Sequence, residues 1–522
     1  MTADVSSEHS VSAGAEAKDK ASHADYAVEN GLPGGDMTPE EERHMVRKMD
    51  INIFPILICL YILSFLDRVN IGMCIAQNII PRAQLTFPFQ GNARLYHLED
   101  DLGLKGNEYQ LCVSMLFVTY VTFELPTNLV LKMVQPKRFI PMISIGWGII
   151  SMCTGFVNNK AQMIVMRLLL GVCEAGYFPA ICFYLTFFYR RRELAVRIFY
   201  LFAASAVSGS CGGLLAYAIG HMDGIRGYSA WRWLMILEGI PTIILGAVSY
   251  FVLANDPYDA RYLTDREKSF TPIRRQLDGT SLGMEGDKNK IDWQQCFEAW
   301  KDWKVWSLAT AQIGVTVMLY GYSTFLPTII NALGYSGVHT QLLTIPCYAT
   351  GALIYLVVAH MSDRTGYRGY FVVGGCVAAC TGYAILLGTP HYGAGAQYAG
   401  CIIVAAGLYV AVGIPISWMP NNLPSHYKRA AGQGTSMTLG NCAGIFSSFI
   451  YRTQDKPEYK LGHGLTMAFV FCSGCLFAAT CYFLRRENKK RDRGERDYVL
   501  EGKTPDQIAR LGDYHPEYRY LY

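Results

Sequence analysis

Long apolar runs alternate with short polar stretches along most of this chain. The runs are apolar on all sides, whereas the helices and strands of a soluble protein keep one polar face. A helix needs about 20 apolar residues to cross a bilayer. Twelve runs are long enough, at residues 51–72, 109–131, 139–157, 161–186, 198–220, 232–253, 305–330, 342–361, 370–388, 397–418, 431–451 and 464–484. The pattern therefore predicts an all-α membrane protein with twelve transmembrane helices in two six-helix bundles.

Three longer polar stretches divide the chain, at residues 1–50, 255–303 and 485–522. The internal stretch falls after six runs and before the other six, and repeat-built transporters have two halves of equal helix count. We expect bundles over residues 51–254 and 304–484, joined by a cytosolic linker with a short helix around Trp293 to Trp303. The two terminal stretches are expected to be cytosolic tails, the first largely disordered.

The distribution of lysine and arginine sets the expected orientation. The first fifty residues lack the apolar core of a signal peptide, which favours a cytosolic N-terminus. In that orientation the short inner loops carry eleven basic residues and the short outer loops seven, leaving aside the stretch before Asp100. Basic residues concentrate in cytosolic loops, so this bias agrees with two cytosolic termini. We expect an integral multi-pass protein, located in the plasma membrane.

Composition excludes several classes of function. The net charge of +4 is too weak to indicate nucleic-acid binding, and no basic patch is interleaved with aromatic residues. The sixteen cysteines lie mostly in apolar runs, where they act as small apolar residues rather than as a disulfide framework. No nucleophile, metal-ligand cluster or phosphate-binding glycine loop of enzymatic quality is found. The sequence predicts no enzyme, no catalytic residue, no metal, no cofactor and a monomer.

Charged residues inside the apolar runs are the strongest functional signal. Each costs about 2.5–3.5 kcal/mol at the centre of a membrane unless it faces a partner or a water-filled cavity. All of them fall in the first half of the chain, namely Asp67, Arg68, Glu124, Arg167, Glu174 and Glu238. The second half carries neutral polar groups, including Gln312, Tyr320, Tyr322, Tyr348, Asn421, Asn422 and Asn441. We therefore expect charge recognition by the first half and shape recognition mostly by the second.

Arg167 and Glu174 are seven residues apart, which places them on nearly the same helix face, about 10.5 Å apart along the axis. That separation is too long for a direct ion pair, so each needs another partner. A carboxylate shielded from water near a cation can take up and release a proton, which makes Glu174 a candidate coupling residue; structural roles for both remain the alternative. Arg68 either binds a carboxylate with its guanidinium fork or extends to the membrane interface. Glu124 precedes Pro126, so a bend with the acid bound to a neighbouring helix is the alternative to a role in coupling.

The loop after the eighth run reads Ser362-Asp363-Arg364-Thr365-Gly366-Tyr367-Arg368. Charges this close between two apolar helices, with a glycine that permits a tight turn, are typical of a cytosolic latch in which Asp363 pairs with a basic group. Ordinary topology-setting charge is the alternative. The loop resembles the signature D-R-x-G-x-R of the major facilitator superfamily, with Asp363, Arg364, Gly366 and Arg368 at the matching positions.

Further segments resemble the anion:cation symporter branch of that superfamily, and fungal permeases for allantoate, nicotinate and pantothenate in particular. They are Leu66-Asp67-Arg68-Val69-Asn70-Ile71-Gly72, Glu124-Leu-Pro126-Thr-Asn128, the stretch from Arg167 to Pro179, and the stretch from Trp231 to Pro241. The resemblance covers roughly residues 45–500. It implies that Arg68 holds the carboxylate of a substrate and that Arg167 and Glu174 couple transport to protons. Valines at 113 and 315, where some relatives carry a histidine and an arginine, argue against a dicarboxylate.

Together these features predict uptake of a small organic monoanion, a vitamin or carboxylate such as nicotinate, pantothenate or allantoate, with a proton by alternating access. Arg68 would bind the carboxylate, while Glu174, Arg167 and Glu124 would serve proton coupling. Tyr320, Tyr322 and Asn441 would shape the contact from the second half. A non-transporting nutrient sensor and an uncoupled facilitator are the alternatives.

Residues 73–91 interrupt the resemblance, because the family runs directly from an Asn-Ile-Gly segment to an Asn-Ala-Arg segment. A retained intron in the gene model is one hypothesis. A genuine long outer loop that follows Pro81 is the other.

Overall fold

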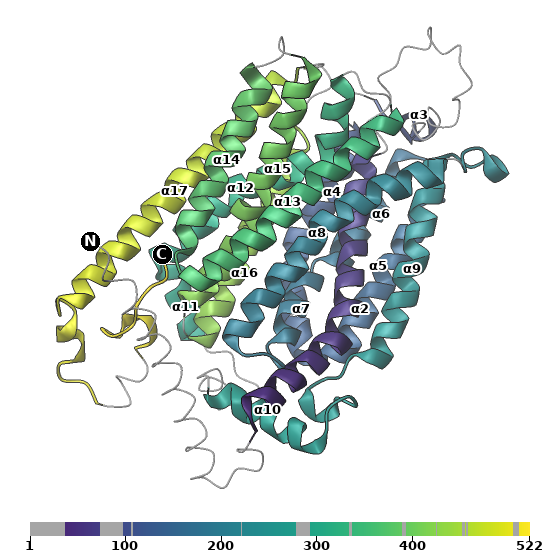
Figure 1. The fold of residues 1–522 in the computed structure, drawn as a ribbon. Coiled ribbons are helices and arrows are strands. Elements are labelled where there is room, and N and C mark those ends of the chain that lie inside the picture. Colours follow the sequence, from purple (N-terminus) through teal and green to yellow (C-terminus); the bar gives the residue numbers. More distant parts are fainter. Residues whose placement is uncertain are drawn as a thin grey trace.

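The computed structural model describes residues 37–73, 98–105, 108–220, 222–277, 293–333, 337–388, 393–423, 425–451, 455, 458–504 and 511–522. All of the regular structure in these residues is helical, which agrees with the predicted fold class (Figure 1). The interruption predicted at residues 73–91 lies outside the described residues from position 74 onward.

The first half of the chain forms six long segments, one for each predicted apolar run. They are α2 (Pro39–Met73), α4 (Glu108–Met133), α5 (Pro136–Thr154), α6 (Lys160–Glu174) continued by α7 (Tyr177–Leu185), α8 (Arg191–Gly220) and α9 (Ala230–Val252). The short α3 (Leu98–Leu102) precedes α4. The fourth segment breaks beside Gly176, where α7 begins. A Cβ atom at Gly176 would collide with Thr127 of α4, so the glycine allows the close approach of these helices.

The second half repeats this arrangement. Its helices are α12 (Trp303–Ala332), α13 (Gly337–Thr365), α14 (Arg368–Gly388), α15 (Ala394–Asn421), α16 (His426–Ser447) and α17 (Lys460–Asp492). Within the described residues, eight segments of the two halves are long and apolar enough to cross a membrane. They are α2, α6 with α7, α9, α12, α13, α14, α15 and α17. Helices α4 and α16, which carry polar residues of the central site, fall outside this set.

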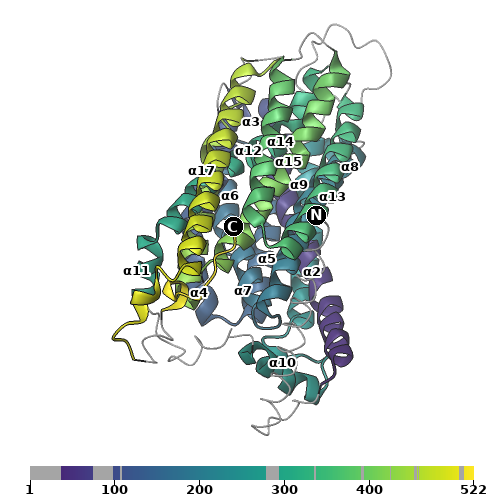
Figure 2. The ribbon, with the colours of Figure 1, turned by 60° about the vertical axis from the view of Figure 1, so that its left-hand side comes forward.

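The described part of the linker contributes two α-helices at one end of the molecule, whereas α3 lies at the opposite end (Figures 1 and 2). These helices are α10 (Asp265–Leu277) and α11 (Trp293–Lys301). Helix α11 confirms the short helix expected near Trp293.

The expected boundary of the N-terminal tail at residue 50 is wrong. Helix α2 begins at Pro39, because Thr38 and Glu41 form a reciprocal cap. The backbone amide of Glu41 donates to Thr38 Oγ1 at 3.3 Å, and the amide of Thr38 donates to Glu41 Oε2 at 2.8 Å. Pro39 fits the first helical position, where no amide hydrogen is needed. The sequence Thr38-Pro39-Glu40-Glu41 therefore already indicated the start of this helix.

The C-terminal stretch is also more ordered than a simple tail. Helix α17 continues to Asp492, and residues 511–522 fold back against the second bundle. Trp418 Nε1 donates to the carbonyl of Leu521 at 2.8 Å, and Asn488 Nδ2 donates to the carbonyl of Tyr520 at 2.8 Å. Asp513 is buried and accepts hydrogen bonds from Lys304 and Lys428 at 2.9 and 2.8 Å. This segment therefore joins the starts of α12 and α16.

Candidate binding site between the two bundles

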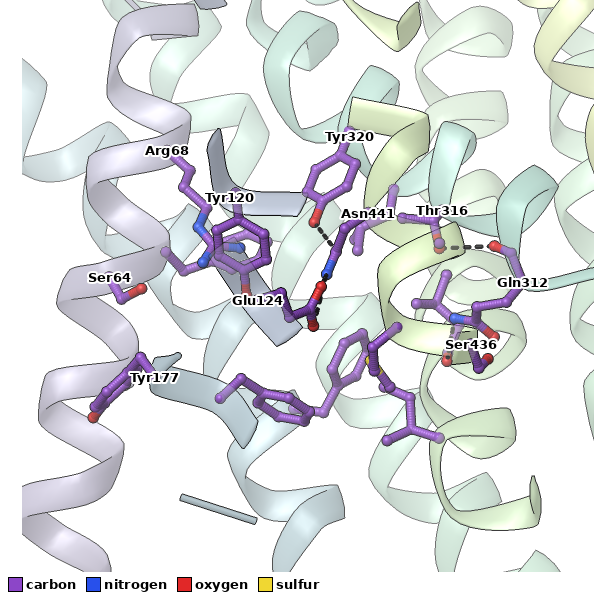
Figure 3. A pocket seen from close by; sticks show the side chains of 18 of the residues that line it. Ser64, Arg68, Tyr120, Glu124, Tyr177, Gln312, Thr316, Tyr320, Ser436 and Asn441 are labelled. Atoms are coloured by element: carbon purple, nitrogen blue, oxygen red, sulfur yellow. Dashed lines mark hydrogen bonds between the residues drawn. The ribbon is translucent and has the colours of Figure 1, made fainter. Parts of the chain in front are cut away.

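A small cavity lies between the bundles, lined by α2, α4, α7 and α8 on one side and by α12, α15 and α16 on the other (Figure 3). Its volume is about 60 Å³, which is room for a few water molecules. Pockets that hold organic ligands usually measure about 300–1,000 Å³. The halves must therefore move apart before a substrate of that size can enter. The polar lining residues are Ser64, Arg68, Tyr120, Glu124, Tyr177, Gln312, Thr316, Tyr320, Ser436 and Asn441.

Arg68 forms the main ion pair of the site. Its Nε lies 2.6 Å from Oε2 of Glu174, whose side chain has no exposed surface. Its guanidinium also stacks over the ring of Tyr120, 4.6 Å from the centroid, and Figure 3 shows the two side chains together. Arg68 faces the cavity, whereas Glu174 lies behind it and reaches the cavity only through Arg68. The partner that the sequence required for Glu174 is therefore Arg68.

A second buried group lies next to this pair. Ser151 Oγ donates to Asp67 Oδ1 at 2.6 Å, and Arg167 Nη1 donates to the backbone carbonyl of Asp67 at 3.5 Å. Asp67 and Arg167 are both 2% exposed. Within the described residues, Nε and Nη2 of Arg167 have no hydrogen-bond partner, and neither has Oδ2 of Asp67. Two basic and two acidic side chains thus share one buried region. The sequence located Asp67 but assigned it no role.

Glu124 connects the two halves through hydrogen bonds. Asn441 Nδ2 of α16 donates to Oε2 of Glu124 at 3.2 Å, and Thr438 Oγ1 donates to the same oxygen at 3.4 Å. The hydroxyl of Tyr320 on α12 donates to Asn441 Oδ1 at 2.8 Å (Figure 3). The sequence analysis gave binding to a neighbouring helix as one alternative for Glu124. That helix is α16 of the other bundle, and the partner is Asn441. Sequence reasoning named Glu124, Tyr320 and Asn441 individually, but it missed Thr438 and the connection between the bundles.

The bundles also meet between the cavity and the end of the molecule that carries α3. Ser114 Oγ of α4 donates to the carbonyl of Ile445 of α16 at 2.9 Å. Phe117 packs against Gly444, where a Cβ atom would collide with its ring. These contacts join α4 and α16 on that side of the cavity.

The structure brings four of the predicted substrate and coupling residues to the cavity: Arg68, Glu124, Tyr320 and Asn441. The prediction for Tyr322 is wrong. Its hydroxyl donates to the carbonyl of Cys401 at 2.9 Å, and the residue is 1% exposed inside the second bundle. The reason is helical periodicity, because residues two apart on a helix differ by about 200° and face opposite sides.

The predicted loop Asp363 to Arg368 lies outside the cavity, and it comprises the last residues of α13, Gly366 and Tyr367 between the helices, and the first residue of α14. Arg368 Nη2 donates to Asp363 Oδ1 at 2.6 Å, and Nη1 donates to Ser417 Oγ at 2.6 Å. Gly366 has φ of +73°, a conformation that favours glycine. The Arg368 guanidinium lies 6.0 Å from the ring centroid of Phe199 on α8, so the loop contacts the first bundle, while Arg364 is exposed.

Comparison with known proteins decides the family. Residues 57–448 match the family model described as Major Facilitator Superfamily. The chain belongs to this superfamily. A major facilitator protein is a transporter of small molecules rather than an enzyme, and this one is an integral multi-pass membrane protein.

Two similar proteins are fungal transporters. It is 36% identical over 457 residues to "Uncharacterized transporter C1002.16c" of Schizosaccharomyces pombe, a match that covers 88% of this chain and 86% of the relative. It is 34% identical over 485 residues to "High-affinity nicotinic acid transporter" of Saccharomyces cerevisiae, which covers 92% of this chain and 85% of that one.

A solved structure agrees at the level of the fold. A bacterial homologue of the human lysosomal transporter Spinster, in an inward-facing and unoccupied conformation, superposes with a TM-score of 0.57. It is 16% identical, and the match covers 82% of this chain and 96% of that one. The similarity confirms the major facilitator fold.

Proposed function

We propose that this transporter carries a small organic monocarboxylate, of which nicotinate is the best candidate, into the cytosol together with a proton. Both termini would lie in the cytosol and the protein in the plasma membrane. The single observation that carries the proposal is the ion pair of Arg68 with the fully buried Glu174 at the wall of the cavity.

Arg68 supplies the recognition of the carboxylate. An arginine presents a planar fork of donors that matches the two oxygens of a carboxylate, and it stays charged at any physiological pH. The same side of the cavity also carries aromatic rings, from Tyr61, Tyr177, Phe178 and Phe202. Aromatic side chains suit a flat ring, and they provide little hydrogen bonding for a second carboxylate. A planar aromatic monocarboxylate therefore fits the chemistry of the lining.

The same ion pair provides a route to proton coupling. A substrate carboxylate that binds Arg68 competes with Glu174 for the guanidinium. Glu174 would then be buried without its cation, and burial favours the neutral form of a carboxyl in that position. Substrate binding would thus be linked to protonation of Glu174, with Arg167 and Asp67 adjusting the local charge. Release of both to the cytosol would restore the ion pair.

Alternating access requires the cross-bundle contacts to open and close. The bonds of Glu124 with Asn441 and Thr438 would break when the halves separate. The loop that contains Asp363, Gly366, Arg364 and Arg368 would hold the cytosolic side closed, because Arg368 contacts both Asp363 and the first bundle. The exposed Arg364 would set the charge of that surface.

The substrate class gains support from the relative in Saccharomyces cerevisiae that is named as a high-affinity nicotinic acid transporter. The 34% identity extends over 92% of this chain, so the likeness includes both halves of the cavity.

Uptake by proteoliposomes tests the proposal. Purified protein would be reconstituted and supplied with labelled nicotinate, with and without an inward proton gradient, and competed with pantothenate, allantoate and succinate. We expect accumulation that depends on the gradient and that succinate does not inhibit. Equal uptake without a gradient would identify a facilitator, and binding without accumulation would identify a sensor. Either result would contradict the proposal, as would preference for another substrate class.

A further inference from the structure

A second, much larger cavity lies at the end of the molecule that carries α10 and α11. It has a volume of about 940 Å³ and is bounded by the end of α11, the start of α12, the last turns of α17 and the C-terminal segment. That volume is in the range of ligand pockets. The cavity is separate from the central site, since the two share no lining residue.

Its walls carry an excess of unpaired positive charge. The two acidic residues that line it are already paired, because Asp302 contacts Lys304 at 2.9 Å and Glu487 accepts from both Arg496 Nε and Nη2, at 2.7 and 2.8 Å. Four other basic side chains line the cavity and form no hydrogen bond or ion pair with the described residues. They are Lys301, Arg486, Lys490 and Lys503. Among the described residues that line the cavity, four cations and no carboxylate remain available, which suits a multiply charged anion.

Aromatic residues place the cavity at the membrane boundary. Trp303 and Phe483, which both line it, form an edge-to-face pair with centroids 5.9 Å apart, and each is about half exposed. Exposed tryptophan and other aromatic rings at the ends of transmembrane helices lie at the level of lipid headgroups. The cavity therefore opens where a lipid phosphate would lie.

Helix α11 strengthens this placement. Trp293, Phe297 and Trp300 are all exposed, at 56%, 54% and 39%, and their spacing puts them on one face of the helix. An exposed aromatic face on a short helix next to the first residues of α12 is typical of a helix lying in the membrane interface. The helix would then rest on the same leaflet that supplies the ligand.

We propose that this cavity binds the phosphate-bearing headgroup of an anionic membrane lipid, with phosphorylated inositol lipids as the best match for four cations. The headgroup would lie between Arg486 and Lys490 on one wall and Lys301 and Lys503 on the other, and the acyl chains would pass Trp303 and Phe483 into the bilayer. Anionic lipids are concentrated in the cytoplasmic leaflet, which agrees with the proposed orientation. Direct binding in detergent tests this site without any transport, so its result is separate from that of the uptake assay.

The experiment uses the purified full-length protein in a neutral detergent and measures binding of dioctanoyl phosphatidylinositol 4-phosphate. Dioctanoyl phosphatidylcholine is the neutral control, and inositol 1,4-bisphosphate is the soluble control. We expect saturable binding of the phosphoinositide, no binding of phosphatidylcholine and much weaker binding of the soluble headgroup. The double variant Arg486→Gln/Lys490→Gln should bind the phosphoinositide roughly 30-fold more weakly.

The matched control is Arg485→Gln/Lys489→Gln, which removes the same charge one residue earlier on α17, outside the cavity. It should bind as the native protein does. Lys301→Gln/Lys503→Gln, on the opposite wall, gives a second test if the first double variant has a lowered melting temperature without lipid. Equal losses in the Arg486/Lys490 and Arg485/Lys489 variants would overturn the site. Equal affinity for the soluble bisphosphate would overturn the membrane lipid as its source.

Discussion

Arg68 on α2 and Glu174 on α6 are 106 residues apart in the sequence, yet their side chains form an ion pair of 2.6 Å. The carboxylate is fully buried, while the guanidinium keeps 13% of its side-chain surface exposed at the cavity. The pair is therefore accessible from one side only. An anion in the cavity can reach the arginine but not the glutamate, which is the geometry that competition for Arg68 requires.

Glu174→Gln should separate exchange from accumulation. Glutamine keeps the shape of the side chain and can accept a hydrogen bond from Arg68, but it cannot take up a proton. We expect substrate exchange across the membrane to stay within a few-fold of the native rate, while accumulation driven by a proton gradient is lost. Glu238→Gln, which changes a buried carboxylate that does not line the cavity, should keep both activities. Accumulation by the Glu174→Gln variant would show that the coupling residue is another.

Arg68→Gln should weaken substrate binding more than any other change in the lining. Charge-assisted hydrogen bonds contribute about 1.5–3 kcal/mol, so KM in exchange assays should rise roughly 10- to 100-fold. Arg68→Lys keeps the charge without the fork and should recover only part of this loss. Arg232→Lys is the control, because Arg232 is also buried but binds carbonyl oxygens of the same bundle. A KM that changes equally in the Arg68→Lys and Arg232→Lys variants would argue against carboxylate binding by Arg68.

Asn441→Ala should favour separation of the two halves. The alanine side chain cannot donate the hydrogen bonds that Asn441 Nδ2 makes to Glu124. It also cannot accept the hydrogen bond from the Tyr320 hydroxyl. At about 1 kcal/mol for each lost hydrogen bond, the open population should increase roughly 5-fold or more. Hydrogen–deuterium exchange along α4 and α16 should be faster as a result. Tyr322→Phe, which loses a hydrogen bond inside the second bundle only, should leave this exchange unchanged; matching increases in both variants would contradict the cross-bundle role.

The ion pairs that dock residues 511–522 through Asp513 should not depend on pH in the physiological range. Burial alone would raise the pKa of Asp513, but Lys304 and Lys428 outweigh it and hold this pKa below its ordinary value. When folding lowers the pKa of a carboxyl, its ionised form stabilises the folded state. This stabilisation is complete above the ordinary pKa of about 3.9, and it is lost only as pH falls through the lower pKa of the folded state. Protection of the segment from trypsin should therefore be the same at pH 5 and pH 8. The pH dependence of transport would then have to arise elsewhere.

Asp513→Asn should release the segment at all pH values. The variant loses charge-assisted bonds to Lys304 and Lys428, worth roughly 2 kcal/mol, although Asp302 still contacts both lysines. Trypsin should cleave after Arg519 faster in this variant, while Asp497→Asn, at an exposed position, should match the native rate. Release of the native segment between pH 8 and pH 5 would contradict the conclusion that the ion pairs of Asp513 hold the segment in place.

Most of the helical framework was predictable from the sequence because membrane burial forces long apolar runs. The predicted run at 305–330, for example, corresponds to α12 (Trp303–Ala332). The ends were less predictable. Polar capping residues such as Thr38 and amphipathic extensions such as the end of α17 continue a helix beyond the apolar run into water, where hydropathy gives no signal.

The site was predictable as a set of residues but not as a set of contacts. Arg68, Glu124 and Glu174 stand out because charge in an apolar run is costly. That Arg68 pairs with Glu174, and Glu124 with Asn441, depends on the packing of helices far apart in the chain. The error at Tyr322 had a local cause, since the helical period already separates it from Tyr320. The docked C-terminal segment gave no hydropathy signal, because polar residues separate the few aromatic and aliphatic side chains that pack against the second bundle.

The most direct test of the central claim is proton uptake on substrate binding. Nicotinate would be added to purified protein in weakly buffered detergent solution with a pH indicator, for the native chain and for Glu174→Gln. Competition for Arg68 predicts that binding makes the solution more alkaline for the native protein, as Glu174 is protonated, and leaves the pH unchanged for the variant. Saturable nicotinate binding to the native protein without proton uptake would contradict the account.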